Sequence, residues 1–159
     1  EEYDQSIWVD AKMNALKPLD KVADSLLKDG DFFAKAHDKR NCVYAEAETC
    51  IKGKHADPNV IRKQADYYRK KGYPKNNGLV ATGIIFRNHK SEALIKCEEF
   101  WFDQINSFCA RDQISFPFSA WSTNFQYNLI PNSISGPNWF PYFQAWHHRI
   151  KRGRKTAWY

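Results

Sequence analysis

Short apolar runs of β-forming residues alternate along this chain with longer segments of helical periodicity. The run Ser6–Val9 ends at Asp10, and a second run covers residues 32–36. Apolar residues have helical spacing at 19–29, between these two runs, and again at 41–51. Because strands that alternate with helices are typical of α/β domains, we predict an α/β fold.

Two further helices have clear start signals. Asp57 followed by Pro58 predicts a capped helix N-terminus with proline in the first turn, and Gly72 closes that helix. Ser91 begins the longest predicted helix. Between them, the strand predicted at 79–86 contains Gly83, and glycine inside a strand indicates a bulge or the close approach of another group.

A last helix is predicted to open at Arg111-Asp112-Gln113. Pro117 is expected to bend this helix or to confine it to its first turn, because proline lacks the backbone N–H of a helix interior. With two or three strands in all, the pattern is thin for a complete doubly wound sheet. We therefore expect the second half of a larger fold, or a reduced version of it.

Length and composition favour one globular domain over residues 1–159. The chain is 43% hydrophobic and 26% charged, which is typical of a folded soluble protein. No apolar run is long enough to span a membrane, and no signal peptide is visible. The net charge of +6 is concentrated in a basic tail, 149–159, and points only weakly to a polyanionic partner.

The four cysteines show no CxxC pair and no metal spacing. Cys42 and Cys50 lie eight residues apart, and Cys97 falls on the apolar stripe of a predicted helix. We interpret all four, Cys109 included, as reduced and mostly buried thiols of a cytoplasmic protein. A secreted chain with two disulfides is the alternative.

Asp10 is the first candidate for chemistry, because it follows a predicted strand directly. In open α/β sheets, ligands bind beyond the carboxyl ends of strands, and an acid there can hold a divalent cation that bridges a diphosphate. The alternative is a surface turn.

Two other candidates are clusters at element ends. Asn77 and Gly78 in a turn, with Gly83 in the following strand, would let backbone amides reach a sugar hydroxyl or phosphate oxygen. Asp112, between Arg111 and Gln113, could orient sugar hydroxyls and act as a base. A plain hairpin turn and a helix cap are the respective alternatives.

Histidines form the last candidate group. His147 and His148 precede the basic tail, where imidazole and cations suit a diphosphate leaving group. His37 and Arg40 form a smaller polar cluster after the second strand. Surface histidines are the alternative. The sequence contains no GxSxG, HExxH, Walker or zinc-ligand pattern.

Four ordered segments resemble one known family, the glycosyltransferase-like domain shared by bacterial polysaccharide-synthesis proteins and plant mucilage proteins. Residues 4–10 (DQSIWVD) resemble its YD-x-SIW(I/V)D strand, and residues 37–47 resemble H-x-x-R-x-C-x-Y-x-E-A. Residues 77–89 resemble NGL-x-x-x-G-(V/I)-I-x-R-x-H, and residues 111–116 resemble RDQ-x-SF.

The resemblance implies a three-layer sandwich similar to nucleotide-sugar transferases of the GT-A type. It implies an acceptor-side site at Asp112, flanked by Arg111 and Gln113, and Mn²⁺ or Mg²⁺ held by Asp10 with His147 or His148. The histidine assignment rests on chain order alone. The implied donor-binding residues are Asp10, Lys12, His37, Arg40, Asn77, Gly78 and Gly83.

Two departures from the family pattern bear on the donor site. Lys12 stands where a second carboxylate of an Asp-x-Asp pair would be, and it could neutralise a diphosphate directly. In the family, the nucleotide-binding half precedes the acidic strand, whereas nine residues precede Asp10 here. The chain is thus expected to be a fragment or to carry an incomplete donor site.

These features predict a glycosyltransferase that moves a sugar from a nucleotide-diphosphate donor to a glycan or small acceptor. One alternative is a module that binds nucleic acid or another polyanion, although no nucleic-acid motif is visible. Another is a degenerate transferase domain without catalysis.

Overall fold

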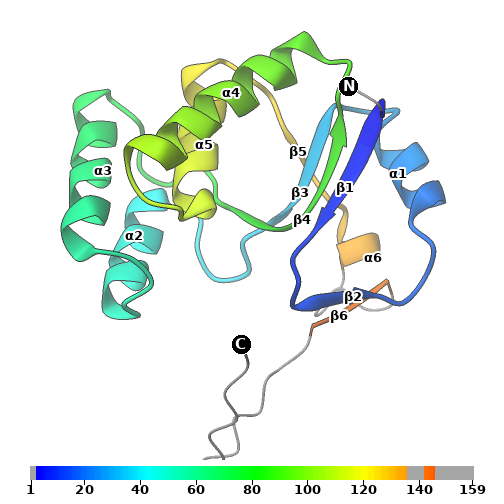
Figure 1. Cartoon of the computed structure of the whole chain (residues 1–159), viewed down its shortest axis with the longest axis horizontal. Helices are drawn as coiled ribbons and strands as arrows, with labels where there is room; N and C mark the ends of the chain where they lie inside the picture. The colour runs from blue at the N-terminus through cyan, green and yellow to red at the C-terminus, as the bar shows by residue number, and fades with distance from the viewer. Residues whose placement is uncertain (1–2, 136–141, 146–159) are drawn as a thin grey trace, which may run out of the picture.

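A four-stranded sheet in the order β1-β4-β3-β5 lies at the centre of the fold (Figure 1). The computed structural model describes residues 3–135 and 142–145. Strand β4 is antiparallel to both β1 and β3, while β5 is parallel to β3. The predicted α/β class is confirmed. The strands are β1 (Gln5–Val9), β3 (Phe32–Ala36), β4 (Val80–Asn88) and β5 (Asn128–Leu129).

The strand directions bring several loops to one end of the sheet. Because β1 and β3 both run antiparallel to β4, their carboxyl ends lie where β4 begins. Asp10 follows β1, His37 follows β3, and Leu79 precedes β4. We call this end of the sheet, with its three loops, the polar edge; it faces downward in Figure 1.

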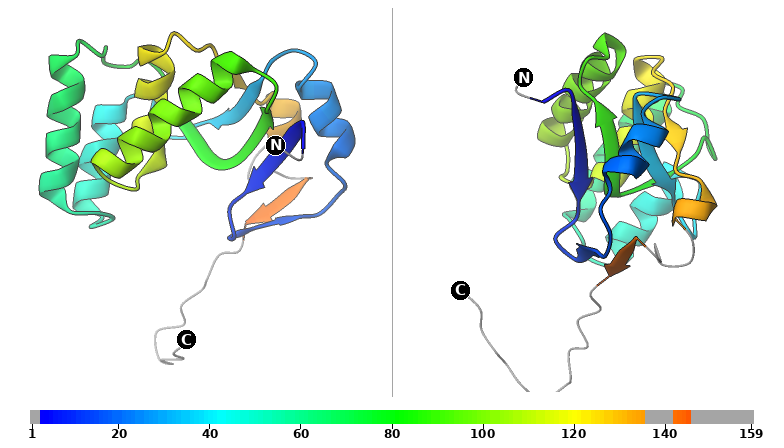
Figure 2. Two further views of the ribbon diagram at one scale, coloured as in Figure 1. Left: turned by 45° about the horizontal axis from the view of Figure 1, so that its top comes forward. Right: turned by 90° about the vertical axis from the view of Figure 1, so that its right-hand side faces the viewer.

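Helices cover both faces of the sheet, which makes three layers (Figures 1 and 2). Helix α1 (Asp20–Leu26) packs on one face, where Phe33 and Phe86 point. Helices α4 (Glu92–Ser107) and α5 (Asp112–Ser122) pack on the other, toward Phe32 and Ile85. Neighbouring residues of one strand serve opposite cores because side chains alternate along a strand.

Helices α2 (Val43–Lys52) and α3 (Pro58–Lys70) form a lobe against α5, away from the sheet. Its core includes the rings of Tyr68 and Phe118, which stack with centroids 3.8 Å apart. Asp57 caps α3 by accepting a hydrogen bond from the Asn59 backbone, as its sequence position predicts. Gly72 follows the helix with a positive φ of 82°, which glycine adopts at low cost.

Pro117 does not confine α5 to its first turn, so that part of the sequence prediction is wrong. The helix continues to Ser122 because its aromatic neighbours anchor it on both sides. Phe116 stacks on Phe32 with centroids 4.4 Å apart, and Phe118 stacks on Tyr68 in the helical lobe. This packing offsets the one backbone hydrogen bond that proline cannot make.

A two-stranded ribbon, β2 (Met13–Ala15) with β6 (Phe143–Ala145), lies beside the polar edge, and α6 (Asn132–Ser135) follows β5. All four cysteines are buried and unpaired, as predicted. Within the described residues, none of the helices has the length and apolar character needed to cross a bilayer.

Candidate active site

Asp10 lies in the turn that leads out of β1 at the polar edge. Its backbone N–H donates to the Gly83 carbonyl at 2.7 Å, and its carboxylate accepts from the backbone N–H of Lys12 at 2.9 Å. Both bonds hold the carboxylate beside β4. A Cβ built on Gly83 would lie 3.9 Å from the Asp10 Cβ, which is ordinary van der Waals contact. The Asp10 side chain therefore does not by itself require glycine at position 83.

Asp112 occupies the first turn of α5, and both of its carboxylate oxygens are engaged. The buried Thr82 hydroxyl of β4 donates to Oδ2 at 2.6 Å, and the backbone N–H of Gln113 donates to Oδ1 at 2.8 Å. Each oxygen keeps a second lone pair. The carboxylate is thus held in one orientation and can still accept a hydrogen bond from a substrate.

The two acids lie 102 positions apart in the sequence, but both form hydrogen bonds with one short stretch of β4. Asp10 contacts Gly83 through the backbone, and Asp112 contacts Thr82 through its side chain. The register between β3 and β4 shifts just here, between Ala34 and Lys35. This irregularity lies at Gly83, where the sequence predicts a bulge or the close approach of another group.

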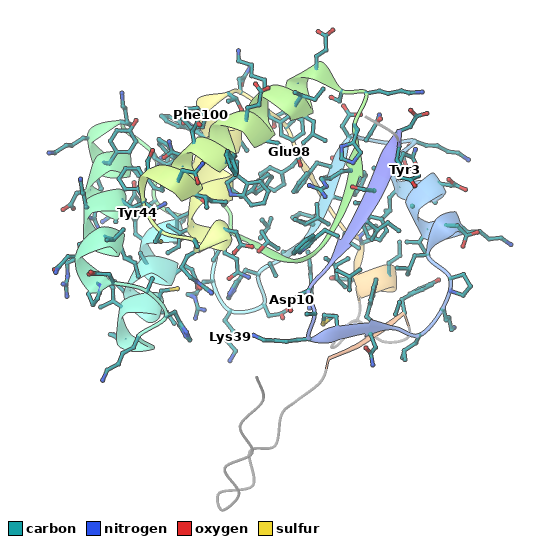
Figure 3. The ribbon with its side chains drawn as sticks, in the orientation of Figure 1. Tyr3, Asp10, Lys39, Tyr44, Glu98 and Phe100 are labelled. Atoms are coloured by element: carbon teal, nitrogen blue, oxygen red, sulfur yellow. The ribbon has the colours of Figure 1, made fainter. Side chains whose placement is uncertain are left out.

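His37 and Arg40, in the loop after β3, are fixed by Glu46 of α2. Arg40 Nε donates to Glu46 Oε2, and His37 Nε2 lies 3.7 Å from the same oxygen. Figure 3 shows this loop at the polar edge, with Lys39 and Asp10 labelled. Glu46 is 4% exposed, and Cys50 Sγ lies 3.5 Å from its Oε1. Sequence analysis missed Glu46 as a site residue, although it stands in the segment 37–47.

The His37 imidazole is held as an acceptor. Its Nδ1 accepts from the backbone N–H groups of Lys39 and Arg40, each at 3.2 Å, so the neutral ring carries its proton on Nε2. Burial lowers the pKa of His37 below its usual 6.5, more than the nearby Glu46 raises it. The ring is therefore neutral at pH 7 and adds no positive charge to the polar edge.

The neutral His37 predicts a loss of stability on acidification. The pKa of His37 is lower in the folded chain than in the unfolded one, so the unfolded state binds more protons just below pH 6.5. The free energy of unfolding therefore decreases as the pH is lowered through that window. We expect His37→Asn, which keeps an acceptor but cannot titrate, to flatten part of this decline. Urea unfolding at pH 7.5 and pH 5 measures it. His55→Asn, at an exposed histidine, is the control; an equal flattening there would contradict the assignment.

A pocket of about 580 Å³ opens at the polar edge between the loop after β3, the turn before β4 and the C-terminal half of α5. Gly78 lies in its wall with a positive φ of 91°, and a Cβ there would come within 3.1 Å of the Tyr127 hydroxyl. The positive φ favours glycine at this position, and a Cβ would in addition require the Tyr127 hydroxyl to shift by a few tenths of an ångström. Four predicted donor-binding residues line the pocket: His37, Arg40, Asn77 and Gly78.

The other walls of this pocket were not predicted. Pro117 and Trp121 come from α5, and the segment 124–127 (NFQY) follows that helix. The alternation of amides and aromatic rings in 124–127 was the available signal, but without a strand or helix pattern it indicated only an irregular segment.

The remaining predicted residues lie elsewhere. Asp10, Asp112 and Gly83 are at the polar edge but outside the pocket lining. Lys12 is exposed in the turn after Asp10, and Arg111 and Gln113 flank Asp112 at the start of α5. His147, His148 and the tail 149–159 lie outside the described residues.

Comparison of the sequence with known protein families identifies the family of this chain. The model of the TOD1/MUCI70 glycosyltransferase-like domain matches residues 2–133. The chain belongs to this family. A curated relative, the "Probable hexosyltransferase MUCI70" of Arabidopsis thaliana, is 29% identical over 122 residues, which cover 70% of the chain and 21% of the relative. The chain thus spans about a fifth of that protein's length. No solved structure matches it.

In this TOD1/MUCI70 domain, the structure explains which residue types occur in the segment 37–47. Its histidine and arginine contact the pocket, and its glutamate is the buried partner that holds both. Cys42 and Val43 bury the start of α2 in the core of the lobe. One stretch of sequence therefore combines the wall of the pocket with its support.

The described part of this glycosyltransferase-like domain does not complete a metal cage. Within residues 3–135 and 142–145 there is no group of three or more acidic, histidine or cysteine side chains that could hold an ion. Asp10 is the one member of the predicted metal set that these residues include. A single carboxylate does not satisfy a hard cation that takes six or more oxygen ligands.

Proposed function

We propose that this chain carries the acceptor-side part of a glycosyltransferase that moves a sugar from a nucleotide-diphosphate donor to a hydroxyl of a glycan or small acceptor. Membership of the glycosyltransferase-like family supports the general activity. The observation that carries the finer proposal is that Asp10 and Asp112 form hydrogen bonds with adjacent residues of β4, Gly83 and Thr82, at the edge where the pocket opens.

Asp112 is assigned the role of base toward the attacking hydroxyl. Thr82 and the N-terminus of α5 hold its carboxylate, and the free lone pairs can accept the proton of an acceptor hydroxyl. The sugar carbon then bonds to that oxygen while the diphosphate leaves with the electrons of the broken bond. Arg111 and Gln113, its neighbours in the sequence, are assigned to the adjacent hydroxyls of the acceptor.

Lys12 is assigned to the donor diphosphate, and Asp10, whose carboxylate would repel phosphate oxygens directly, is assigned to the ribose hydroxyls of the donor. The exposed Lys12 offers a cation to a phosphate oxygen. The described residues do not complete a cage for Mn²⁺ or Mg²⁺, so no step of this proposal passes through a metal ion.

Calorimetric titration of the whole protein that carries this chain tests the proposal. We expect a UDP- or GDP-sugar to bind, and Lys12→Ala to weaken its binding about tenfold or more, since a hydrogen bond to a charged group contributes about 1.5–3 kcal/mol. Lys28→Ala, at an exposed lysine just after α1, should leave affinity unchanged. Titrations with and without manganese show whether an ion takes part. Absence of binding under both conditions would contradict the proposal.

A polyanion-binding module is the competing function, favoured only by the net charge of +6. It predicts RNA binding that weakens steeply with salt. If RNA bound in this way and no nucleotide-sugar did, the polyanion function would replace the transferase.

A further inference from the structure

The pocket beside the acidic pair differs from that pair in chemistry. Arg40 is the single residue with a permanent charge among its described lining residues, and Glu46 neutralises it. His37 adds no charge at neutral pH, because its Nδ1 accepts two backbone N–H groups and burial disfavours the protonated ring. The pocket is therefore electrically neutral and offers little to a diphosphate.

Three exposed amide residues are among those that line the pocket. Asn41 comes from the loop before α2, and Asn124 and Gln126 come from the segment after α5. All three are exposed, and within the described residues their side chains make no hydrogen bond to the protein. Each offers two donors and an acceptor, the combination that sugar hydroxyls, themselves donors and acceptors, can satisfy.

An aromatic platform completes the pocket. Trp121 is 41% exposed, and packing holds its ring in place. Its centroid lies 5.5 Å from that of Tyr73 at an interplanar angle of 80°. The rigid, accessible indole can pack against the apolar C–H face of a pyranose ring while amides bind the hydroxyls.

From the neutral lining, the ring of uncommitted amides and the exposed indole, we infer that the pocket binds an uncharged saccharide, packed against Trp121. This inference rests on the proposed function in one respect: it makes the saccharide the acceptor glycan of the transfer reaction. It changes the role predicted for His37, Arg40, Asn77 and Gly78, which then contact acceptor rather than donor.

The inference is tested by binding alone, without donor or turnover. The probes are neutral tetrasaccharides of glucose and of galactose, compared with tetragalacturonate and UMP, in calorimetric titrations of the whole protein. We expect a neutral tetrasaccharide to bind and Trp121→Ala to weaken it about tenfold or more, as the loss of an aromatic packing surface predicts. Trp8→Ala removes a tryptophan that is 53% exposed on β1 and should leave affinity unchanged.

A second variant guards against a folding defect in Trp121→Ala. Gln126 is exposed and contacts no core, so Gln126→Ala should keep the unfolding midpoint and weaken the saccharide about 2- to 10-fold through one lost hydrogen bond. The inference is overturned if neither neutral tetrasaccharide binds, if Trp8→Ala weakens binding as much as Trp121→Ala, or if tetragalacturonate or UMP binds more tightly.

Failure of this inference can be told apart from failure of the proposed function. Asp103→Asn, at an exposed aspartate of α4 that has no role in the proposed reaction, should keep the affinity for the neutral saccharide. Saccharide binding without any nucleotide-sugar binding would leave the pocket assignment standing and overturn the transferase. If the protein transferred sugar but Trp121→Ala and Gln126→Ala left the saccharide affinity unaltered, the transferase function would stand and the pocket assignment would be overturned.

Discussion

Asp112→Asn is expected to lower the rate of sugar transfer about 10²- to 10⁴-fold, the usual contribution of a general base. The substitution preserves the shape of the side chain and one acceptor for Thr82, but an amide cannot take the proton of an attacking hydroxyl. Transfer to the acceptor is measured with the whole protein that carries this chain, at saturating donor and acceptor.

The matched control for Asp112→Asn is Asp103→Asn, at an exposed aspartate of α4. It makes the same chemical change away from the polar edge and should leave the rate within about twofold, as expected of a surface substitution. A transfer rate that is unchanged in Asp112→Asn would contradict the role of base and support the non-catalytic alternative. The transfer rate of Thr82→Val should lie between the rates of Asp112→Asn and Asp103→Asn, because this substitution removes the hydroxyl that orients the carboxylate but leaves the carboxylate itself.

Glu46→Ala should cause the largest loss of stability among the substitutions near the pocket. The buried carboxylate neutralises Arg40, whose side chain is 25% exposed. Removing one partner of a buried ion pair leaves the other charge uncompensated, and we expect the free energy of unfolding to fall by about 3 kcal/mol. Urea unfolding followed by tryptophan fluorescence measures the change.

Glu48→Ala provides the control for Glu46→Ala, because Glu48 is exposed on the same helix. Its effect should stay within about 0.5 kcal/mol. Removing both partners, Glu46→Ala with Arg40→Ala, should recover part of the loss, since no unpaired charge then remains. Equal losses for the two glutamates would show that Arg40 does not depend on its buried partner.

Local signals in the sequence predicted most helix and strand positions. Asp57 caps its helix as predicted, α4 begins at its N-cap Ser91 as predicted, and Asp10 follows β1 directly. Such features depend on residues within a few positions of each other, so they can be recognised without the fold. Pro117 shows the limit, because distant packing partners outweigh its local effect.

The candidate site was predicted only in part, for the same reason. Asp10 and Asp112 could be singled out as acids at element ends, but nothing in the chain between them indicates that they share one stretch of β4. Trp121 has the periodicity of a core residue, and its exposure depends on how α5 sits against the rest of the domain. Glu46 reads as an ordinary helix acid until its burial is known.

The amino-acid sequence alone determined the α/β class, the helix caps, the positions of the two acids and the family, because these follow from short-range chemistry and from ordered motifs. The tertiary structure alone decided that β4 enters between β1 and β3, which brings the two acids and the pocket to one edge of the sheet. It also decided that the pocket is neutral, through the pairing of Arg40 with Glu46. Strand order and charge pairing depend on contacts between distant residues, whose free energy no local pattern encodes.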